Sequence, residues 1–234
     1  MTRINFVGGE KGGVGKSVLS RVLAQYHIDN SLPFSAFDGD LSHGALVRYY
    51  GEFTTAVDIN NFENADQMLE ASVESGSNVI VDLAAQSSKR IDHWMSESGV
   101  IELANELGVT VTLWHVMDDG SDSVRLLEKT LNTYGNSVEH IIVRNHGRGK
   151  DFLLFDESEA KLRAESYGAK IIDLPALHSG SMRKIDQVGA SLWAAANNKD
   201  KATGPTLGML ERQRVKVWLG KAYAQLDTVL NPSL

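Results

Sequence analysis

Six short apolar runs, rich in β-branched residues, recur along the 234-residue chain and constrain its fold more than any other feature. Most are apolar almost throughout, which is typical of parallel strands that are covered on both faces. Segments of helical period separate them, as expected where each strand connects to the next through a crossover helix. The runs lie at 4–7, 34–37, 79–83, 109–116, 140–143 and 170–174, with a weaker seventh, TAVDIN, at 55–60.

The intervening segments predict helices at 16–29, 89–107, 121–134, 156–167 and 181–197. Runs and helices together predict an α/β fold with a doubly wound, mostly parallel sheet and helices on both faces. We expect one domain over 1–234, in which 206–234 form a C-terminal amphipathic helix after a polar linker at 197–206. Ligands bind such sheets beyond the carboxyl ends of the strands, so residues that directly follow each run are the first site candidates.

The stretch FVGGEKGGVGKS at 6–17 lies between the first predicted strand and the first predicted helix, the context that a phosphate-binding P-loop requires. Glycines in this stretch allow successive backbone N–H groups to point inward, and the helix N-terminus adds its positive dipole end. Lys16 can then reach the β- and γ-phosphates, and Ser17 can bind a magnesium ion. Glu10 stands where the usual spacing has a glycine, and a second lysine, Lys11, follows it.

The variant x-K-G-G-x-G-K-S resembles the deviant Walker A motif of the ParA/MinD family, also called SIMIBI-class ATPases. The resemblance implies that the cofactors are ATP and Mg²⁺. It also implies that Lys11 reaches across a dimer interface to phosphates bound by the other subunit; a solvated surface lysine is the alternative. The remaining nucleotide-binding residues that it implies in and after the loop are Gly12, Gly13, Val14, Gly15 and Val18.

Three aspartates lie at or just after the ends of predicted strands and resemble the family's switch and Walker B segments. In FDGD, the resemblance implies that Asp40 positions or activates the attacking water and that Asp38 supports the magnesium shell. Asp82 ends NVIVD and matches the Walker B aspartate, which binds magnesium through water. Carboxylates suit both tasks, because a hard cation prefers oxygen ligands and a nucleophilic water needs an acceptor. Alternatively, Asp38 caps a turn and Asp40 is solvated.

Two later segments resemble the family's base-binding loops. Asn145 ends HIIVRN and matches an asparagine that hydrogen-bonds the adenine edge in this family, since an amide offers both a donor and an acceptor. An ordinary turn role is the alternative. IIDLPALHSG resembles the loop that closes over the base, with Pro175 and Leu177 packing beside the ring.

Composition excludes several classes of function. The chain has no cysteine, which excludes disulfides, thiolate metal sites and iron–sulfur clusters, and argues against nitrogenase-iron-protein-like and zinc-bridged arsenite-pump-like members of the family.

Without a signal peptide or an apolar run of about 18 residues, we expect a cytoplasmic protein. The net charge of -7 offers no general attraction to nucleic acid. Nonspecific DNA binding would need a local patch, for which the candidates are Arg144, Arg148, Lys150, Arg212 and Arg214.

Within the family, the chain resembles plasmid-borne ParA-like proteins of the StbB or MobD kind. We therefore expect a slow, dimer-dependent ATPase that acts as an ATP-dependent dimerisation switch in plasmid partition, stability or conjugative mobilisation. A homodimer is expected, with a plasmid-encoded protein or DNA-bound adaptor as a further partner.

One alternative function is that of a MinD-like membrane-associated regulator, but we expect the C-terminal helix to pack on its own domain. The other is a dethiobiotin-synthetase-like ligase, a class that usually lacks the signature lysine. The acidic segment VMDDGSD at 116–122 is interpreted as a solvated turn.

Overall fold

The computed structural model describes residues 2–200 and 206–230. At its centre is a seven-stranded sheet in the order β3-β2-β4-β1-β5-β6-β7, in which every pair of neighbouring strands is parallel. The strands are β1 (Thr2–Gly8), β2 (Phe34–Asp38), β3 (Thr54–Ala56), β4 (Asn78–Asp82), β5 (Val109–Met117), β6 (Glu139–Asn145) and β7 (Lys170–Leu174). The predicted doubly wound α/β fold is confirmed, and the weak run at 55–60 contributes to the edge strand β3.

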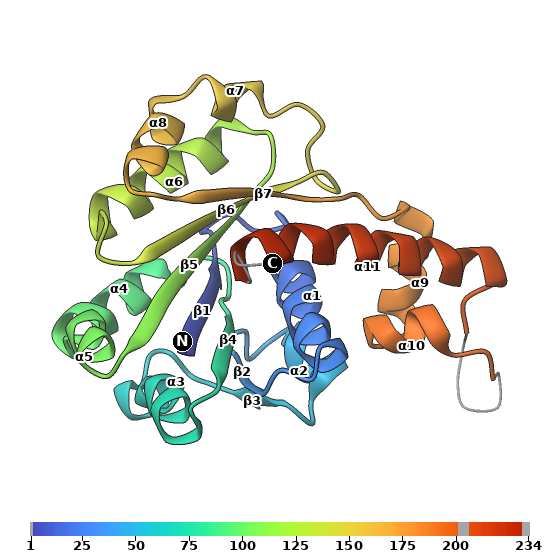
Figure 1. Ribbon diagram of the computed structural model, residues 1–234, viewed down its shortest axis with the longest axis horizontal. Coiled ribbons are helices and arrows are strands. Elements are labelled where there is room, and N and C mark those ends of the chain that lie inside the picture. Colours follow the sequence, from blue (N-terminus) through green and yellow to red (C-terminus); the bar gives the residue numbers. More distant parts are fainter. Residues whose placement is uncertain (1, 201–205, 231–234) are drawn as a thin grey trace.

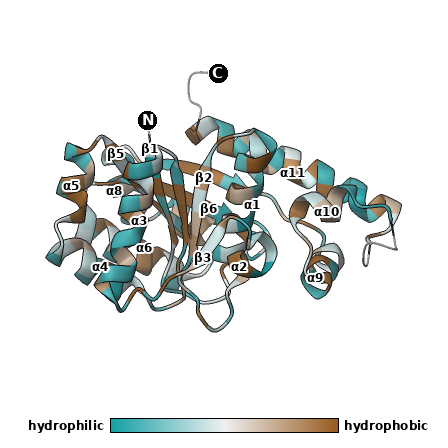
Figure 2. Cartoon of the chain, turned by 90° about the horizontal axis from the view of Figure 1, so that it is seen from below, coloured by the Kyte–Doolittle hydropathy of each residue, from teal (hydrophilic) through white to brown (hydrophobic). Residues whose placement is uncertain are grey.

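Helices cover both faces of this sheet (Figure 1). One face packs against α1 (Lys16–Asp29), α2 (Ala45–Tyr50), α9 (Ser179–Val188), α10 (Leu192–Asn197) and α11 (Met209–Leu230). The other packs against α3 (Phe62–Ser75), α4 (Ser88–Glu97), α5 (Val100–Glu106), α6 (Ser121–Tyr134), α7 (Leu153–Asp156) and α8 (Glu159–Ser166). Figure 2 shows hydrophobic residues concentrated on the strands between the helices, so the core lies on both sides of the sheet.

The central strand β1 determines where a ligand can bind. The chain places β2 to β4 on one side of β1 and β5 to β7 on the other, so the direction of winding changes at β1. The Asn5 side chain connects β1 to both neighbouring strands: its Nδ2 donates to the carbonyl of Val79 on β4 at 3.1 Å, and its Oδ1 accepts from Trp114 Nε1 on β5 at 3.0 Å. The loop after β1 therefore opens at the topological switch point, where open α/β sheets bind ligands.

Two predicted helices, 16–29 and 121–134, have the bounds of α1 and α6. The segment 156–167 corresponds to α8, with Asp156 as the last residue of α7, whereas 89–107 and 181–197 are each divided into two helices. Gly99 separates α4 from α5 with φ of 58°, and Gly189 ends α9 with φ of 63°. Glycine adopts this left-handed conformation without the steric cost of a Cβ atom. Between α7 and α8, the Ser158 hydroxyl accepts a hydrogen bond from the backbone N–H of Lys161 at 3.2 Å and caps α8.

The sequence interpretation missed α2 and α3. The start of α3 is capped by Asn61, whose side chain accepts from the backbone N–H of Asn64 at 3.2 Å. Its core-facing side carries Ala65, Met68 and Leu69, all buried against the sheet. This helix supplies the crossover between β3 and β4 that a parallel connection needs.

The predicted packing of the C-terminal helix on its own domain is confirmed, with bounds of Met209–Leu230; residues 231–234 and linker residues 201–205 lie outside the described residues. Leu210, in the first turn of this helix, is 63% exposed. Gln225 Oε1 accepts from the backbone N–H of Asp173 at 2.9 Å, so α11 covers part of the edge strand β7. The side chains that α11 buries are Val215, Trp218, Leu219, Ala222, Leu226 and Val229.

Within residues 2–200 and 206–230, none of the helices combines the length and the apolarity needed to cross a bilayer.

Candidate functional site

The predicted phosphate loop connects β1 to α1 at the carboxyl edge of the sheet. Its bends depend on glycine, because Gly13 has φ of 78° and Gly15 has φ of 102°. The Gly15 carbonyl accepts from the backbone N–H groups of Val18 and Leu19, each at 3.1 Å, which starts α1. A glycine-rich loop that leads directly into a helix N-terminus can bind an anion through its N–H groups and the helix dipole.

Lys16 lies inside this loop. It is buried, and its Nζ donates to the backbone carbonyl of Lys11 at 2.9 Å, so the ammonium bridges the two ends of the loop. Burial lowers the pKa of Lys16, while the carboxylates of Asp82, Asp40 and Glu10 act in the opposite direction. A triphosphate would supply the concentrated negative charge that a buried ammonium needs.

Asp82, at the end of β4, fits a divalent cation. Its side chain is 2% exposed, and within the described residues its Oδ1 has no hydrogen-bond partner. Burial raises the pKa of Asp82 to about 7; Asp38 contributes in the same direction, and Ser17, Ser20 and Lys16 partly offset both. A buried, unpaired carboxylate oxygen beside the Ser17 hydroxyl is the donor set that Mg²⁺ prefers.

Asp38 lies opposite Asp82 in the register of β2 and β4. Its Oδ2 accepts from the backbone N–H groups of Leu46 at 2.8 Å and Val47 at 3.1 Å, and its Oδ1 accepts from that of Asp40 at 3.0 Å. Burial raises the pKa of Asp38, although these hydrogen bonds favour the ionised form. Asp38 therefore caps the N-terminus of α2, a helix that the sequence did not predict, and its contribution to a magnesium shell stays a prediction.

Asp40 lies on the loop that follows. Its Oδ1 accepts from the backbone N–H groups of Ser42 at 3.1 Å and His43 at 2.9 Å, and 38% of its side chain is exposed. The carboxylate is close enough to Lys16 to favour the protonated ammonium. An accessible carboxylate near the phosphate loop can act on a water molecule, and this role stays a prediction.

The second lysine of the loop points elsewhere. Lys11 Nζ lies 2.8 Å from Asp118 Oδ2, just beyond the end of β5, and Asp118 also accepts from the Ser123 hydroxyl at 2.7 Å. The pair is partly exposed, at 31% for Lys11 and 19% for Asp118. Although burial opposes it, the pKa of Asp118 is lowered by the bonds from Lys11 and Ser123 and from the Gly120 backbone. Lys11 is therefore an ion-paired residue in this structure.

A cavity of about 580 Å³ opens beside the first turn of α1. This volume is in the range of small-ligand pockets. Arginines 48, 148 and 183 are among its lining residues. The wall of this cavity includes all four residues that lie outside the phosphate loop and were assigned to the nucleotide, namely Val18, Asn145, Pro175 and Leu177. Trp218 of α11 closes the wall behind Pro175, whose carbonyl accepts from its Nε1 at 2.6 Å.

Comparison with known proteins agrees with this geometry. No protein-family model matches the chain. Protein MobD of Acidithiobacillus ferrooxidans is 27% identical over 179 residues, which cover 74% of this chain and 77% of MobD. A TraL protein of Escherichia coli is 24% identical and is matched over 97% of this chain and 98% of its own length.

Among solved structures, MinD in its complex with MinC from Aquifex aeolicus aligns with 94% of this chain and 96% of its own, with a TM-score of 0.56 and 12% identity. The chain has a MinD-like P-loop fold. An ADP complex of a nucleotide-binding protein from Archaeoglobus fulgidus also aligns, with a TM-score of 0.50 and 16% identity over 80% of this chain and 86% of its own. These structural matches concern the fold.

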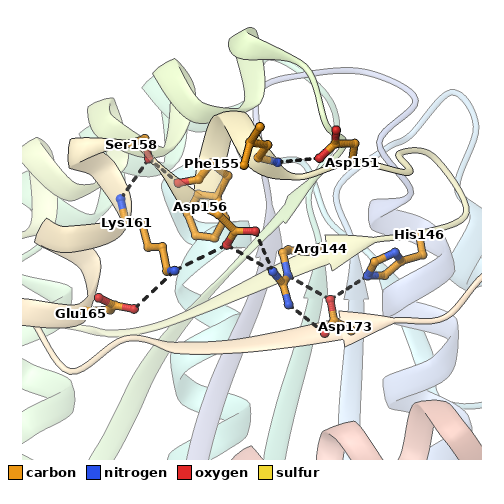
Figure 3. Close-up of polar contacts among 10 residues, drawn as sticks. Arg144, His146, Asp151, Phe155, Asp156, Ser158, Lys161, Glu165 and Asp173 are labelled. Carbon is orange, nitrogen blue, oxygen red and sulfur yellow. Dashed lines mark hydrogen bonds and ion pairs between the residues drawn. The ribbon is translucent and has the colours of Figure 1, made fainter.

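Two of the basic residues considered for a DNA patch, Arg144 and Arg212, are bonded within the protein. Arg144 binds Asp173 through two bonds of 2.9 Å and Asp156 through two of 3.2 Å (Figure 3). Arg212 donates to the Leu207 carbonyl at 2.6 Å. The charge of Arg144 is thus paired with two carboxylates inside the protein and offers little attraction to a nucleic acid backbone.

Two acidic groups near the phosphate loop make contacts that the sequence interpretation did not assign. Asp118 belongs to the segment interpreted as a solvated turn, and that interpretation is wrong for this residue because it binds Lys11. Glu10, in the place of the usual glycine, lies 3.9 Å from Lys129 on α6. A carboxylate at the end of a strand neighbouring β1 was the signal that could have identified Asp118.

Proposed function

We propose that this chain is a slow ATPase whose Mg²⁺–ATP form dimerises and acts as a switch in plasmid partition, stability or conjugative mobilisation. The observation that carries the proposal is the opposite placement of two lysines on one loop. Lys16 lies inside the loop and donates to its backbone, whereas the ammonium of Lys11 points out of the loop and forms an ion pair with Asp118. The likeness to MobD supports the plasmid setting that the sequence predicts.

Each residue at the edge of the sheet has a role in this proposal. The loop N–H groups and the N-terminus of α1 bind the phosphates, and Lys16 neutralises the β- and γ-oxygens. Ser17 and Asp82 would bind magnesium, with Asp38 behind them. Bound Mg²⁺–ATP supplies a transferable γ-phosphoryl group. Asp40 orients the water and accepts its proton.

Lys11 gives the switch its dependence on the γ-phosphate. In the dimer, the Lys11 ammonium of each protomer contacts the phosphates bound by the other, adding positive charge where charge develops during hydrolysis. A diphosphate offers less negative charge to that ammonium and stabilises the dimer less. Loss of the γ-phosphate then favours separation of the protomers.

Nucleotide binding and association are tested separately. We expect Lys16→Ala to abolish binding of Mg²⁺–ATP in calorimetry, while Lys89→Ala, which removes an exposed lysine of α4, binds like the wild type. We expect Asp40→Ala to retain binding and to accumulate as a dimer in size-exclusion chromatography with Mg²⁺–ATP. A wild-type protein that binds Mg²⁺–ATP but stays monomeric, together with a monomeric Asp40→Ala, would contradict the switch.

The two alternative functions have less support. A membrane-surface helix needs a free apolar side, whereas the apolar side of α11 is buried against α1, α10 and β7. The ligase alternative gives no role to Lys11.

A further inference from the structure

The cavity beside the first turn of α1 gathers positive charge. Three exposed arginines line it: Arg48 on α2, Arg148 on the loop after β6, and Arg183 on α9. Within residues 2–200 and 206–230, the guanidinium groups of Arg148 and Arg183 make no hydrogen bond, ion pair or ring contact. Arg48 donates only to a backbone carbonyl, that of Asp186, at 3.1 Å, and its guanidinium lies over the Tyr49 ring. Three cations without a carboxylate partner thus share one cavity, although the net charge of the protein is -7.

The one carboxylate among the described residues that line this cavity does not offset these charges. It belongs to Asp186, and its Oδ1 accepts from Arg21 Nη1 at 2.7 Å. Arg21 is 3% exposed. A buried guanidinium that loses its carboxylate is left as an uncompensated charge, which is costly, so Asp186 is committed to Arg21. The cavity therefore has an excess of positive charge, which an anionic ligand would neutralise.

The proposed ATP does not use this charge through its base. The base belongs beside Asn145 and Leu177, at the end of the cavity next to the phosphate loop. Asn145 Nδ2 donates to the Val14 carbonyl at 2.7 Å, and its Oδ1 accepts from the Gly147 N–H at 2.9 Å. The amide keeps a second N–H and a second oxygen lone pair for a base edge. Because adenine carries no net charge, its recognition there gives no role to three guanidinium groups.

The connectivity of a nucleotide indicates which part of it would meet the arginines. The 5′ carbon of the ribose leads to the phosphates and the 1′ carbon to the base, whereas the 2′ and 3′ hydroxyls point away from both. Once the phosphate loop and the base wall are assigned, the remaining wall of the cavity is lined by α2 and α9, with Arg48, Arg183 and Gln187. A group attached to the ribose hydroxyls is directed towards that wall.

We propose that this cavity binds a nucleotide that carries an additional phosphate on its ribose, and that Arg48, Arg148 and Arg183 form the subsite for that phosphate. The planar guanidinium fork matches phosphate oxygens and can bind two of them at once. In dinucleotide-binding folds, an arginine likewise accommodates a phosphate on the ribose. This inference deepens the proposed function and rests on it, because the phosphate loop must hold the 5′ phosphates.

Calorimetry with Mg²⁺ compares ADP with the two forms of ADP that carry a further phosphate on the 2′ or the 3′ oxygen. The readout is the ratio of the Kd for ADP to the Kd for each phosphorylated form, since the contributions of the loop and the base cancel in it. We expect a ratio of roughly ten or more for at least one isomer, the size of one hydrogen-bonded contact between charged groups. Equal Kd values for all three ligands would overturn the inference.

Arg148→Gln and Arg183→Gln test which residues produce the ratio. Each variant should bring it closer to one, and the double variant should bring it to about one. The matched control is Arg125→Gln, which removes the same charge from α6, where Arg125 pairs with Asp122 at 3.1 Å. The control should keep the wild-type ratio. A ratio that survives in the double variant, or that falls equally in the control, would contradict the subsite.

Stability and salt provide two further checks. Because the guanidinium groups of Arg148 and Arg183 have no partner to lose in the part of the chain that the structure describes, both variants should keep the wild-type Tm; a lower Tm would contradict the assignment of these groups as free. Salt screens exposed charges, so the wild-type ratio should fall as the salt concentration rises, and a ratio independent of salt would contradict the inference.

The wild-type data separate this inference from the proposed function. If the wild type binds ADP and both phosphorylated forms equally, nucleotide binding stands and the ribose-phosphate subsite alone fails. If it binds none of the three, both fail.

Discussion

The ion pair between Lys11 and Asp118 opposes the proposed dimer, because each Lys11 must leave its carboxylate before it can contact the other protomer's phosphates. Asp118→Asn removes the charge and keeps an acceptor for the Ser123 hydroxyl and the Gly120 N–H, both of which bond to Asp118 Oδ1. We therefore expect this variant to dimerise more tightly with a nonhydrolysable ATP analogue than the wild type does.

The size of the effect follows from the exposure of the pair. At 31% and 19% exposed, the pair resembles surface salt bridges, which contribute about 0.2–1 kcal/mol each. A dimer breaks two of them, so the gain is about 0.4–2 kcal/mol, or a roughly 2- to 30-fold lower dimer Kd. Salt should reduce the difference, since it screens exposed charges.

Sedimentation equilibrium at several protein concentrations measures this Kd. Asp119→Asn is the matched control, because it removes the same charge from the neighbouring residue, which bonds to the Lys150 backbone at 2.8 Å. It should leave the Kd close to the wild-type value. An Asp118→Asn protein with an unchanged or higher Kd would refute the idea that the pair restrains Lys11.

Three other substitutions test the packing and electrostatics of the site. Trp218→Ala should lower the free energy of unfolding by about 3–5 kcal/mol in urea titrations, whereas Trp193→Ala, at a position 54% exposed, should change it by less than about 0.5 kcal/mol. Equal losses would contradict the assigned packing of α11. Burial lowers the pKa of His115 from 6.5 to about 4, so the stability that its neutral form provides is present above pH 6.5 and is lost as the pH falls towards 4. As the pH falls from 6.5 to 4, the free energy of unfolding should therefore fall less for His115→Gln than for the wild type, by up to about 3 kcal/mol. Parallel profiles of unfolding free energy against pH for the two proteins would contradict this. Asp82→Asn removes a buried charge that its neighbours offset only in part. It should raise the urea midpoint at pH 8 without metal while abolishing Mg²⁺-dependent nucleotide binding; a lower midpoint would contradict the assigned burial penalty.

The strands and the phosphate loop could be predicted because their signals are local. Each of the six strong apolar runs became a strand, and Lys16 starts α1 as its motif requires. The signal for α3 was also present: Asn61 precedes it as a cap, and Ala65, Met68 and Leu69 recur at helical spacing. The divided helices were harder to predict, because a glycine such as Gly99 interrupts a helix only when its backbone adopts a positive φ.

The partners of the site residues could not be predicted, since they depend on contacts between distant segments. Lys11 and Asp118 are 107 positions apart, and Asn145 and Val14 are 131 apart. The sequence identified the residue types at the strand ends, and the register of the sheet determines which of them meet. For Asp38, the short helix α2 supplies backbone donors that no motif indicated.

The most direct test of the switch is complementation between two inactive variants. Lys11→Ala and Asp40→Ala proteins are mixed as monomers before Mg²⁺–ATP is added, and phosphate release is measured. If Lys11 acts across the interface, a mixed dimer contains one complete site, in which the Lys11→Ala protomer hydrolyses its nucleotide with its own Asp40 and its partner's lysine. The account predicts that mixing restores hydrolysis that neither variant shows alone, whereas a mixture as inactive as its components would contradict it.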